Sequence, residues 1–132
     1  MTTAIEYLEN KHKTIINDYC TPDGKYAESC SLIAIDIANL LLNEGKEHPQ
    51  IFIIRGWPIF ENGLKGRKTL EPILFNGRVK FGAHQFCICD GIVYGPLLKE
   101  PIGIKKYPNE VFGKGNFIIE KVFSTKRIKE LS

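Results

Sequence analysis

A cysteine and a histidine carry the chemistry that this sequence suggests. Cys30 opens an apolar run typical of a buried helix, and His84 stands on an alternating run typical of a strand. A thiol attacks a carbonyl at neutral pH when it is accessible, has an imidazole nearby and lies in a field that favours thiolate. The unpaired N–H groups and the dipole of a helix N-terminus supply such a field. The pair therefore predicts acyl-transfer chemistry, with Cys30 as nucleophile and His84 as base.

Histidine suits the role of base because its reference pKa of about 6.5 allows proton exchange near neutrality. The other histidines compete less well, since His12 falls within a predicted helix and His48 falls in a linker beside Pro49. Each residue of the pair also has a purely structural interpretation. A cysteine at a helix start is often a small buried hydrophobe, and a strand histidine is often a hydrogen-bonded core residue. The order of the two residues, and the elements that carry them, favour catalysis.

The helices that must position these residues follow from apolar spacing and turn residues. A first helix is predicted over 3–18, and a second begins near 28–29 and ends at Gly45. Apolar residues between 33 and 42 leave almost no polar face. We therefore expect the second helix to be buried on most of its sides, with Cys30 at its start.

Runs of β-branched and aromatic residues predict strands over 51–57, 69–75, 78–89, 92–94 and 116–123. The Asn-Gly pair at 76–77 and the Asp-Gly pair at 90–91 are strong signals for two-residue hairpin turns, so 69–94 is predicted to form a three-stranded antiparallel meander. A short helix is predicted over 107–112, and a polar basic tail at the end. The chain is thus predicted to be one α+β domain over 1–132, with the cysteine-bearing helix packed on an antiparallel sheet.

The composition is that of an ordinary globular protein of 132 residues, with 43% hydrophobic and 25% charged residues. The net charge of +3 arises from scattered short basic clusters, which disfavours a nucleic-acid partner. We expect no membrane span and see no signal peptide. The expected location is the cytoplasm of the producing cell, with export, if any, through a dedicated secretion system. The four cysteines are then expected to be free thiols.

No cofactor or metal is expected from the sequence. Zinc bound by Cys87 and Cys89 with Cys20 or His84 is disfavoured, because no second cysteine pair stands at ligand spacing. The glycine-rich stretch at 113–115 lacks the strand–loop–helix frame and the Ser or Thr of a phosphate-binding loop.

Two segments resemble a known family. The resemblance rests on Tyr-Ala-Glu-Ser-Cys-Ser-Leu-Ile-Ala at 26–34 and on Gly-Ala-His-Gln-Phe-Cys-Ile-Cys-Asp-Gly-Ile-Val-Tyr-Gly-Pro at 82–96. These are similar to the papain-fold toxin domains of bacterial polymorphic toxin systems, most of all to the second of those families, over about residues 20–113. The resemblance implies a papain-like fold and a cysteine peptidase, glutamine deamidase or transglutaminase that acts on a protein substrate, with a cognate immunity protein as partner. Cys30 matches the family nucleophile and His84 the family base.

The acid that usually completes the family's site is missing. Family members place an Asp on the strand after the histidine, where this chain has Gly95. A two-residue turn before that strand would put Gly95 opposite Phe86 and diagonal to His84, a good place for a carboxylate that orients the imidazole. Asp90 would lie roughly 20 Å along the strand from His84. It is predicted to be a turn residue.

Several alternatives remain for the third group and for function. If 69–75 pairs with 78–89, Glu71 lies diagonal to His84 and could receive its ring N–H. The enzyme could instead work as a dyad, with a backbone carbonyl or an amide orienting the imidazole. Alternatively, the glycine marks a weakened or inactive enzyme that serves as a papain-like protein-binding module. A small adaptor or antitoxin that binds a partner protein is a further class.

An acyl-transfer intermediate also needs hydrogen-bond donors for its oxyanion. The backbone N–H of Cys30, at the expected helix start, is the predicted first donor. A second donor is expected from the residues before it, with Asn17, Tyr19 and Tyr26 as candidates.

Overall fold

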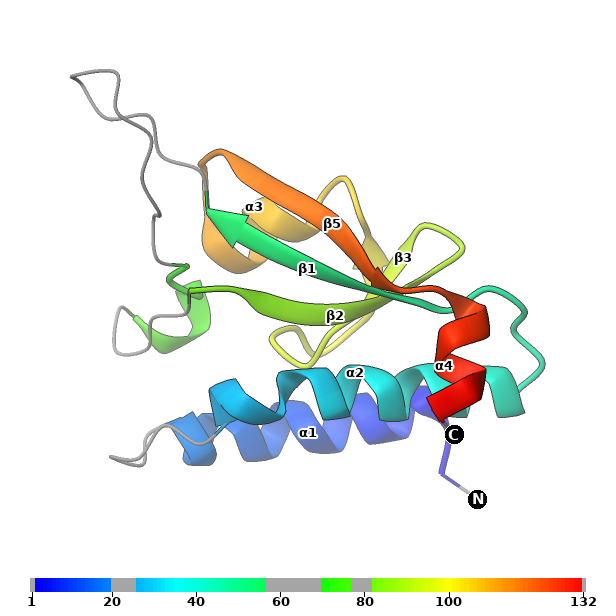
Figure 1. The fold of residues 1–132 in the computed structure, drawn as a ribbon. Helices are drawn as coiled ribbons and strands as arrows, with labels where there is room; N and C mark the ends of the chain where they lie inside the picture. The colour runs from blue at the N-terminus through cyan, green and yellow to red at the C-terminus, as the bar shows by residue number, and fades with distance from the viewer. Residues whose placement is uncertain (1, 20–25, 57–69, 77–81, 132) are drawn as a thin grey trace.

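The computed structural model describes residues 2–19, 26–56, 70–76 and 82–131 (Figure 1). In chain order the elements are α1 (Ala4–Tyr19), α2 (Tyr26–Asn43), β1 (Gln50–Gly56), the 3-10 helix η1 (Ile73–Phe75), β2 (His84–Cys89), β3 (Ile92–Tyr94), β4 (Ile102–Gly103), α3 (Tyr107–Phe112), β5 (Phe117–Phe123) and α4 (Thr125–Leu131). Several predicted features lie outside the described residues, among them Cys20, the Trp57 end of the first predicted strand, Gly77 of the Asn-Gly turn and the start of the strand predicted over 78–89. The side chains of Asn17, Tyr19 and Tyr26, the candidates for a second oxyanion donor, are not described either.

The sheet is antiparallel throughout its described part and has the strand order β4-β3-β2-β1-β5. β2 is therefore the central strand. With its helices on the sheet, the described chain is an α+β protein, and this predicted fold class is confirmed.

α1 and α2 lie side by side below the sheet in the view of Figure 1, and α2 lies between α1 and β2. Ala4, Leu8 and Ile15 of α1 are buried, as expected for apolar residues spaced three and four apart on one helix face. Tyr7 donates its hydroxyl hydrogen to a carboxylate oxygen of Asp36 at 2.8 Å across the pair. The contact with α1 thus holds α2 in place against the sheet.

α2 is buried on most, but not all, of its circumference. Ile33, Ile37 and Leu41 are buried, whereas Leu32 exposes 63% of its surface and Asp36 is also exposed. The expectation that α2 is buried on most sides agrees with its described side chains, which are buried or half-buried except for a stripe at Leu32, Asp36 and Asn43. Ile35, Leu40 and Leu42 are half-buried and pack against the core that Ile33, Ile37 and Leu41 help to form.

The hairpin between β2 and β3 confirms the turn predicted at Asp90 and Gly91. Cys89 pairs with Ile92 across it. The two turn residues have φ angles of 52° and 76°, the positive values that a type I′ turn requires. Glycine adopts such angles without strain and aspartate tolerates them, which is why this local signal was reliable.

The predicted pairing of 69–75 with 78–89 is wrong. β1 takes that place beside β2, with Ile54 opposite His84. The residues after Pro72 form η1 instead of a strand. Proline has no N–H to give to a strand ladder, and its fixed φ favours a turn.

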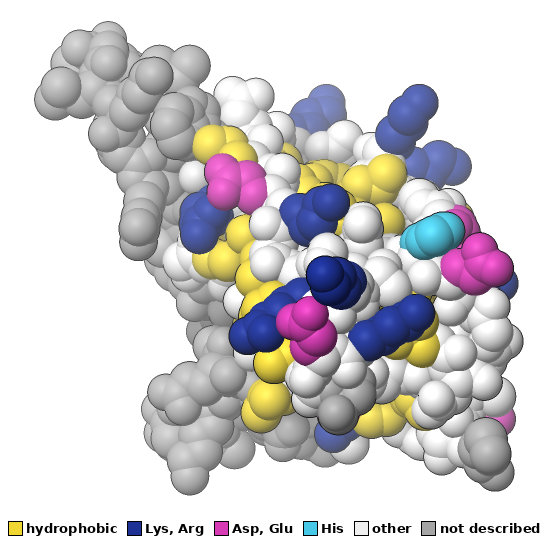
Figure 2. Space-filling view, turned by 45° about the vertical axis from the view of Figure 1, so that its right-hand side comes forward, with side chains coloured by type: hydrophobic (Ala, Val, Ile, Leu, Met, Phe, Trp, Pro, Cys, Tyr) yellow, Lys and Arg dark blue, Asp and Glu magenta, His cyan; other side chains and the backbone are white. Residues whose placement is uncertain are grey.

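Basic and acidic side chains are mixed on the part of the surface that Figure 2 presents. Lys and Arg side chains of the described residues are interrupted there by acidic and apolar ones. Arg127 lies 3.1 Å from Glu130, and Arg55 lies 3.6 Å from Glu120.

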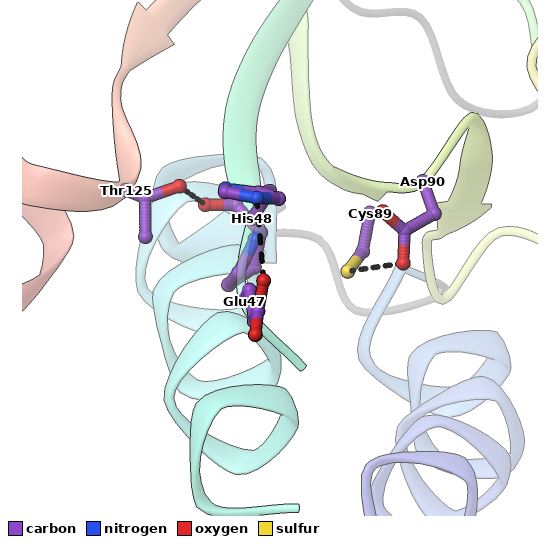
Figure 3. Close-up of polar contacts among 6 residues, drawn as sticks. Glu47, His48, Cys89, Asp90 and Thr125 are labelled. Atoms are coloured by element: carbon purple, nitrogen blue, oxygen red, sulfur yellow. Dashed lines mark hydrogen bonds and ion pairs between the residues drawn. The ribbon is translucent and has the colours of Figure 1, made fainter. Parts of the chain in front are cut away.

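The C-terminal segment is the helix α4 and not the predicted polar tail. The backbone N–H of Arg127 donates to Ser124 Oγ at 3.2 Å, which makes Ser124 an N-cap. Ile128 is buried in the core, and the Thr125 hydroxyl donates to the Pro49 carbonyl at 2.8 Å (Figure 3). The N-cap at Ser124 and the buried side chain of Ile128 therefore hold α4 against the domain, although the other residues of α4 are largely polar.

The two sides of α2 give a stability prediction. Ile37→Ala should lower the free energy of unfolding by about 2–5 kcal/mol, because it leaves a cavity in the core. Leu32→Ala, the matched change on the exposed side, should cost about 0.5 kcal/mol or less. Urea unfolding followed by circular dichroism measures both. Equal losses would contradict the described orientation of α2.

Candidate functional site

α2 and β2 bring the two predicted residues toward one end of the domain. α2 packs on β2, and both elements begin at the same end (Figure 1). Cys30 is the fifth residue of α2, and His84 is the first residue of β2. The residues therefore lie near the starting ends of two packed elements.

Cys30 is a half-buried free thiol that lies deeper in its helix than expected. α2 begins at Tyr26, before the predicted start at 28–29. Only the first four N–H groups of an α-helix lack an intrahelical partner, so the N–H of Cys30 donates within the helix. The prediction that this N–H binds the oxyanion is therefore wrong. The dipole field at the sulfur is also weaker than at a true helix start.

His84 is a core residue with 1% of its surface exposed. Its ring stacks with that of Phe86, with ring centroids 6.3 Å apart. Burial disfavours the imidazolium form and lowers the pKa of His84 from 6.5 to about 4. At neutral pH the ring is therefore uncharged. It can accept a proton, but only as a weak base.

A tyrosine fills the space beside Gly95, the position of the missing acid. A Cβ atom added to Gly95 would lie 3.5 Å from Phe86 Cβ, so Gly95 is opposite Phe86 as the predicted register requires. The same Cβ would lie 3.1 Å from the hydroxyl oxygen of Tyr107. Tyr107 is fully buried at the start of α3, and its ring centroid is 4.7 Å from that of Phe86.

The hydroxyl of Tyr107 is buried and unpaired. Burial, and after it the negative charge of a Cys30 thiolate, raises the pKa of Tyr107 above its usual range. The hydroxyl has no hydrogen-bond partner among the residues that the structure describes, Cys30 included. The sequence indicates only that Tyr107 lies in a short helix, so its burial beside Gly95 could not be predicted from it.

His12 borders the same region from α1. Its Nδ1–H donates to the Pro96 carbonyl at 2.9 Å, which ties the segment after β3 to the first helix. The prediction that His12 belongs to the first helix is confirmed. The hydrogen bond indicates that His12 helps to hold Gly95 and Pro96 in place.

Glu71 and Asp90 are the two carboxylates that the sequence offered for the site. Glu71 is exposed and lines a small pocket together with Gly56. The strand pairing that placed Glu71 diagonal to His84 is not formed, so the argument for an orienting acid at this position is lost. Asp90 is in the turn at the opposite end of β2 from His84, where it accepts a long hydrogen bond of 3.9 Å from Cys89 Sγ (Figure 3).

The thiols of β2 differ from that of Cys30 in their access to water. Cys87 and Cys89 are buried free thiols, and their two-residue spacing puts them on the same face of β2. Burial, and then the neighbouring Cys89, raises the pKa of Cys87 to about 12. Within the described part of the chain, Cys30 is thus the accessible thiol.

Comparison with protein-family models, with curated proteins and with solved structures finds no match to this chain. Among the described residues, no group of three or more His, Cys, Asp or Glu side chains is arranged to hold a metal ion. No helix in that same part of the protein is long and apolar enough to cross a membrane. The resemblance to papain-fold toxin domains stays a prediction, and the functional argument depends on Cys30 and His84.

The buried state of His84 predicts a dependence of stability on pH. The unfolded chain protonates this ring near pH 6.5 and the folded chain only near pH 4. The unfolded state binds more protons between these values, so stability falls as pH is lowered through this window, by about 3 kcal/mol in all. Urea unfolding at several pH values measures the loss.

A His84→Gln variant is the control, because it cannot take up this proton. The difference between wild type and variant removes the contribution of the carboxylates that titrate in the same range. An identical pH dependence in the two proteins would show that His84 is not protected from protonation by the fold.

Proposed function

We propose that the protein is a papain-like cysteine hydrolase or acyltransferase that acts on a protein substrate, as an effector or toxin module of a bacterium. The observation that carries the proposal is the packing of α2 on β2, with Cys30 and His84 near their starting ends (Figure 1). A helix-borne cysteine beside a strand-borne histidine is the arrangement that papain-like enzymes use. The resemblance of the segments at 26–34 and 82–96 to papain-fold toxin domains supports the same proposal.

In the proposed reaction, His84 takes the proton of the Cys30 thiol as the sulfur attacks an amide carbonyl carbon. A C–S bond forms, and the π electrons of the carbonyl move to its oxygen. When the carbonyl re-forms, the C–N bond breaks and His84 returns the proton to the leaving amine or ammonia. Water then hydrolyses the thioester in a peptidase or deamidase, and a substrate amine displaces the thiol in a transglutaminase.

The burial of His84 determines the resting state in this mechanism. A ring whose pKa is about 4 carries almost no charge at neutral pH. The free enzyme would therefore hold a neutral imidazole, and the proton would reach the ring only as the sulfur attacks. This differs from a preformed thiolate–imidazolium pair and implies slow turnover, with groups around the sulfur needed to stabilise the developing negative charge.

Growth of bacteria that express the protein tests the proposal. Wild type should inhibit growth, and Cys30→Ala should lose at least about 100-fold in activity, because removal of a nucleophile leaves only the residual catalysis of the site. Cys89→Ala is the matched control and should inhibit growth as wild type does, since Cys89 is at the opposite end of β2. Full inhibition of growth by Cys30→Ala would contradict the proposal.

Mass spectrometry of the proteins in those cells identifies the reaction type. New protein N-termini indicate a peptidase, conversion of glutamine to glutamate indicates a deamidase, and new glutamine–amine crosslinks indicate a transglutaminase. Each change should disappear in Cys30→Ala. A cognate immunity protein should relieve the growth inhibition when it is expressed with the wild type.

A catalytically inactive binding module on the same scaffold is the second candidate. The full burial of His84 and the glycine at position 95 favour it, because both weaken the general base. Under this alternative, Cys30 should react with iodoacetamide no faster than Cys20. Any effect of the protein on growth should also persist in Cys30→Ala.

A further inference from the structure

A row of ring contacts joins His84 to a small cavity beside the start of β5. The ring centroid of Phe86 lies 6.3 Å from that of His84 and 4.7 Å from that of Tyr107. The ring centroid of Phe112 lies 6.4 Å from that of Tyr107 and 5.9 Å from that of Phe117. Phe112 and Phe117 line the cavity. The packing around the candidate base therefore extends without a break to the wall of this cavity.

The strand register puts the cavity and His84 on the same face of the sheet. Ile54 of β1 is opposite both His84 and Ile119. Gly56, two residues further along β1, is opposite Phe117 and lines the cavity. Residues two apart on a strand share a face. With a rise of about 3.3 Å per residue and about 5 Å between strands, the Cα atom of Gly56 is roughly 8 Å from that of His84, a distance that about two or three residues of an extended segment span.

The cavity has an apolar interior and a polar rim. Its buried and half-buried lining residues are apolar or glycine: Gly56, Leu70, Phe112 and Phe117. Its exposed lining residues are Glu71, Lys114, Gly115 and Asn116. The two charges at the rim have opposite signs, so together they favour neither an anion nor a cation. Such a cavity suits an uncharged, apolar group.

Size limits the group that the cavity can hold. Its volume is about 80 Å³. A protein cavity of roughly 150 Å³ accommodates benzene, which has six carbon atoms, so a cavity of this size accommodates about three or four. That is the side chain of valine or leucine, and the ring of phenylalanine is too large.

We propose that this cavity selects the substrate by taking an aliphatic side chain, valine or leucine, from the extended protein segment whose amide reacts at Cys30. The position of that amide rests on the proposed function, whereas the size and the apolar interior of the cavity do not. An aliphatic side chain gains free energy when it leaves water for such an interior. The cavity thus gives the protein a preference for the sequence near the reacting amide.

Binding of amino-acid amides to the full chain tests the cavity directly. N-acetyl-leucine amide, added to isotope-labelled protein, should shift the backbone amide NMR signals of Leu70, Gly115 and Asn116 and leave those of α4 unchanged. N-acetyl-alanine amide should bind at least about tenfold more weakly, because its side chain lacks three carbon atoms. N-acetyl-phenylalanine amide should bind no more tightly than the alanine compound. Shifts that do not gather at the cavity, or equal binding of the three compounds, would overturn the inference.

A glycine at the rim offers a variant that narrows the cavity. A Cβ atom at position 115 would lie 3.3 Å from a ring carbon of Phe117, so a methyl group there crowds the wall. Gly115→Ala should weaken binding of N-acetyl-leucine amide by at least about threefold, because little space is left to give up. Gly103→Ala on β4 is the matched control, since a Cβ there meets no described atom within 4 Å, and it should bind as wild type does. Equal affinities in the two variants would contradict the placement of the ligand.

Mapping of the modified proteins separates this inference from the proposed function. Sites that change only when Cys30 is present should carry leucine or valine at one fixed position near the changed amide. Cys30-dependent sites without such a residue would contradict the inference and leave the proposed function intact. If the leucine compound binds at the cavity but Cys30→Ala still inhibits growth, the preference of the cavity stands and the proposed function fails.

Discussion

The burial of β2 on both of its faces is the constraint on which the rest of the structure depends. His84 and Phe86 on one face and Cys87 and Cys89 on the other are all buried. α2 packs against this strand, and β1 and β3 flank it. The titratable side chains of His84, Cys87 and Cys89 are therefore withdrawn from water. The lowered pKa of His84 and the raised pKa values of Cys87 and Tyr107 have burial as their first cause.

The same constraint shapes the chemistry that we propose. A dry environment strengthens each hydrogen bond and each charge interaction, but it also disfavours the charged imidazolium that a cysteine hydrolase forms during its reaction. A site with an aspartate beside the histidine would offset that penalty. Here the position holds Gly95, and the neutral hydroxyl of Tyr107 occupies the space. The positive charge at His84 therefore has no carboxylate at this position to stabilise it.

The sequence was informative where structure follows from local signals. The Asp90–Gly91 turn, the first two helices and the class of fold could all be predicted from residue types and spacing within a few positions of each other. The pairing of β2 with β1 could not, because a strong local hairpin signal at Asn76 competed with a distant partner. α4 was missed although Ser124 is a typical N-cap residue, since its single buried side chain, Ile128, gives no apolar periodicity.

The candidate site divides in the same way. Cys30 and His84 were accessible to prediction because each has a distinctive residue type on a recognisable element. The degree to which His84 is buried depends on packing between distant segments. The helical turn that precedes Cys30 depends on a helix start that no cap residue marked. The burial of Tyr107 could not be predicted because it depends on how α3 packs against β2 and the residue after β3, which meet only in the folded chain.

The most direct test is the crystal structure of the protein treated with a peptide aldehyde, which forms a hemithioacetal with a catalytic thiol and imitates the tetrahedral intermediate. The account predicts an adduct on Cys30, with a His84 ring nitrogen within hydrogen-bond reach of it. Absence of an adduct, or an adduct separated from His84 by core side chains, would contradict it.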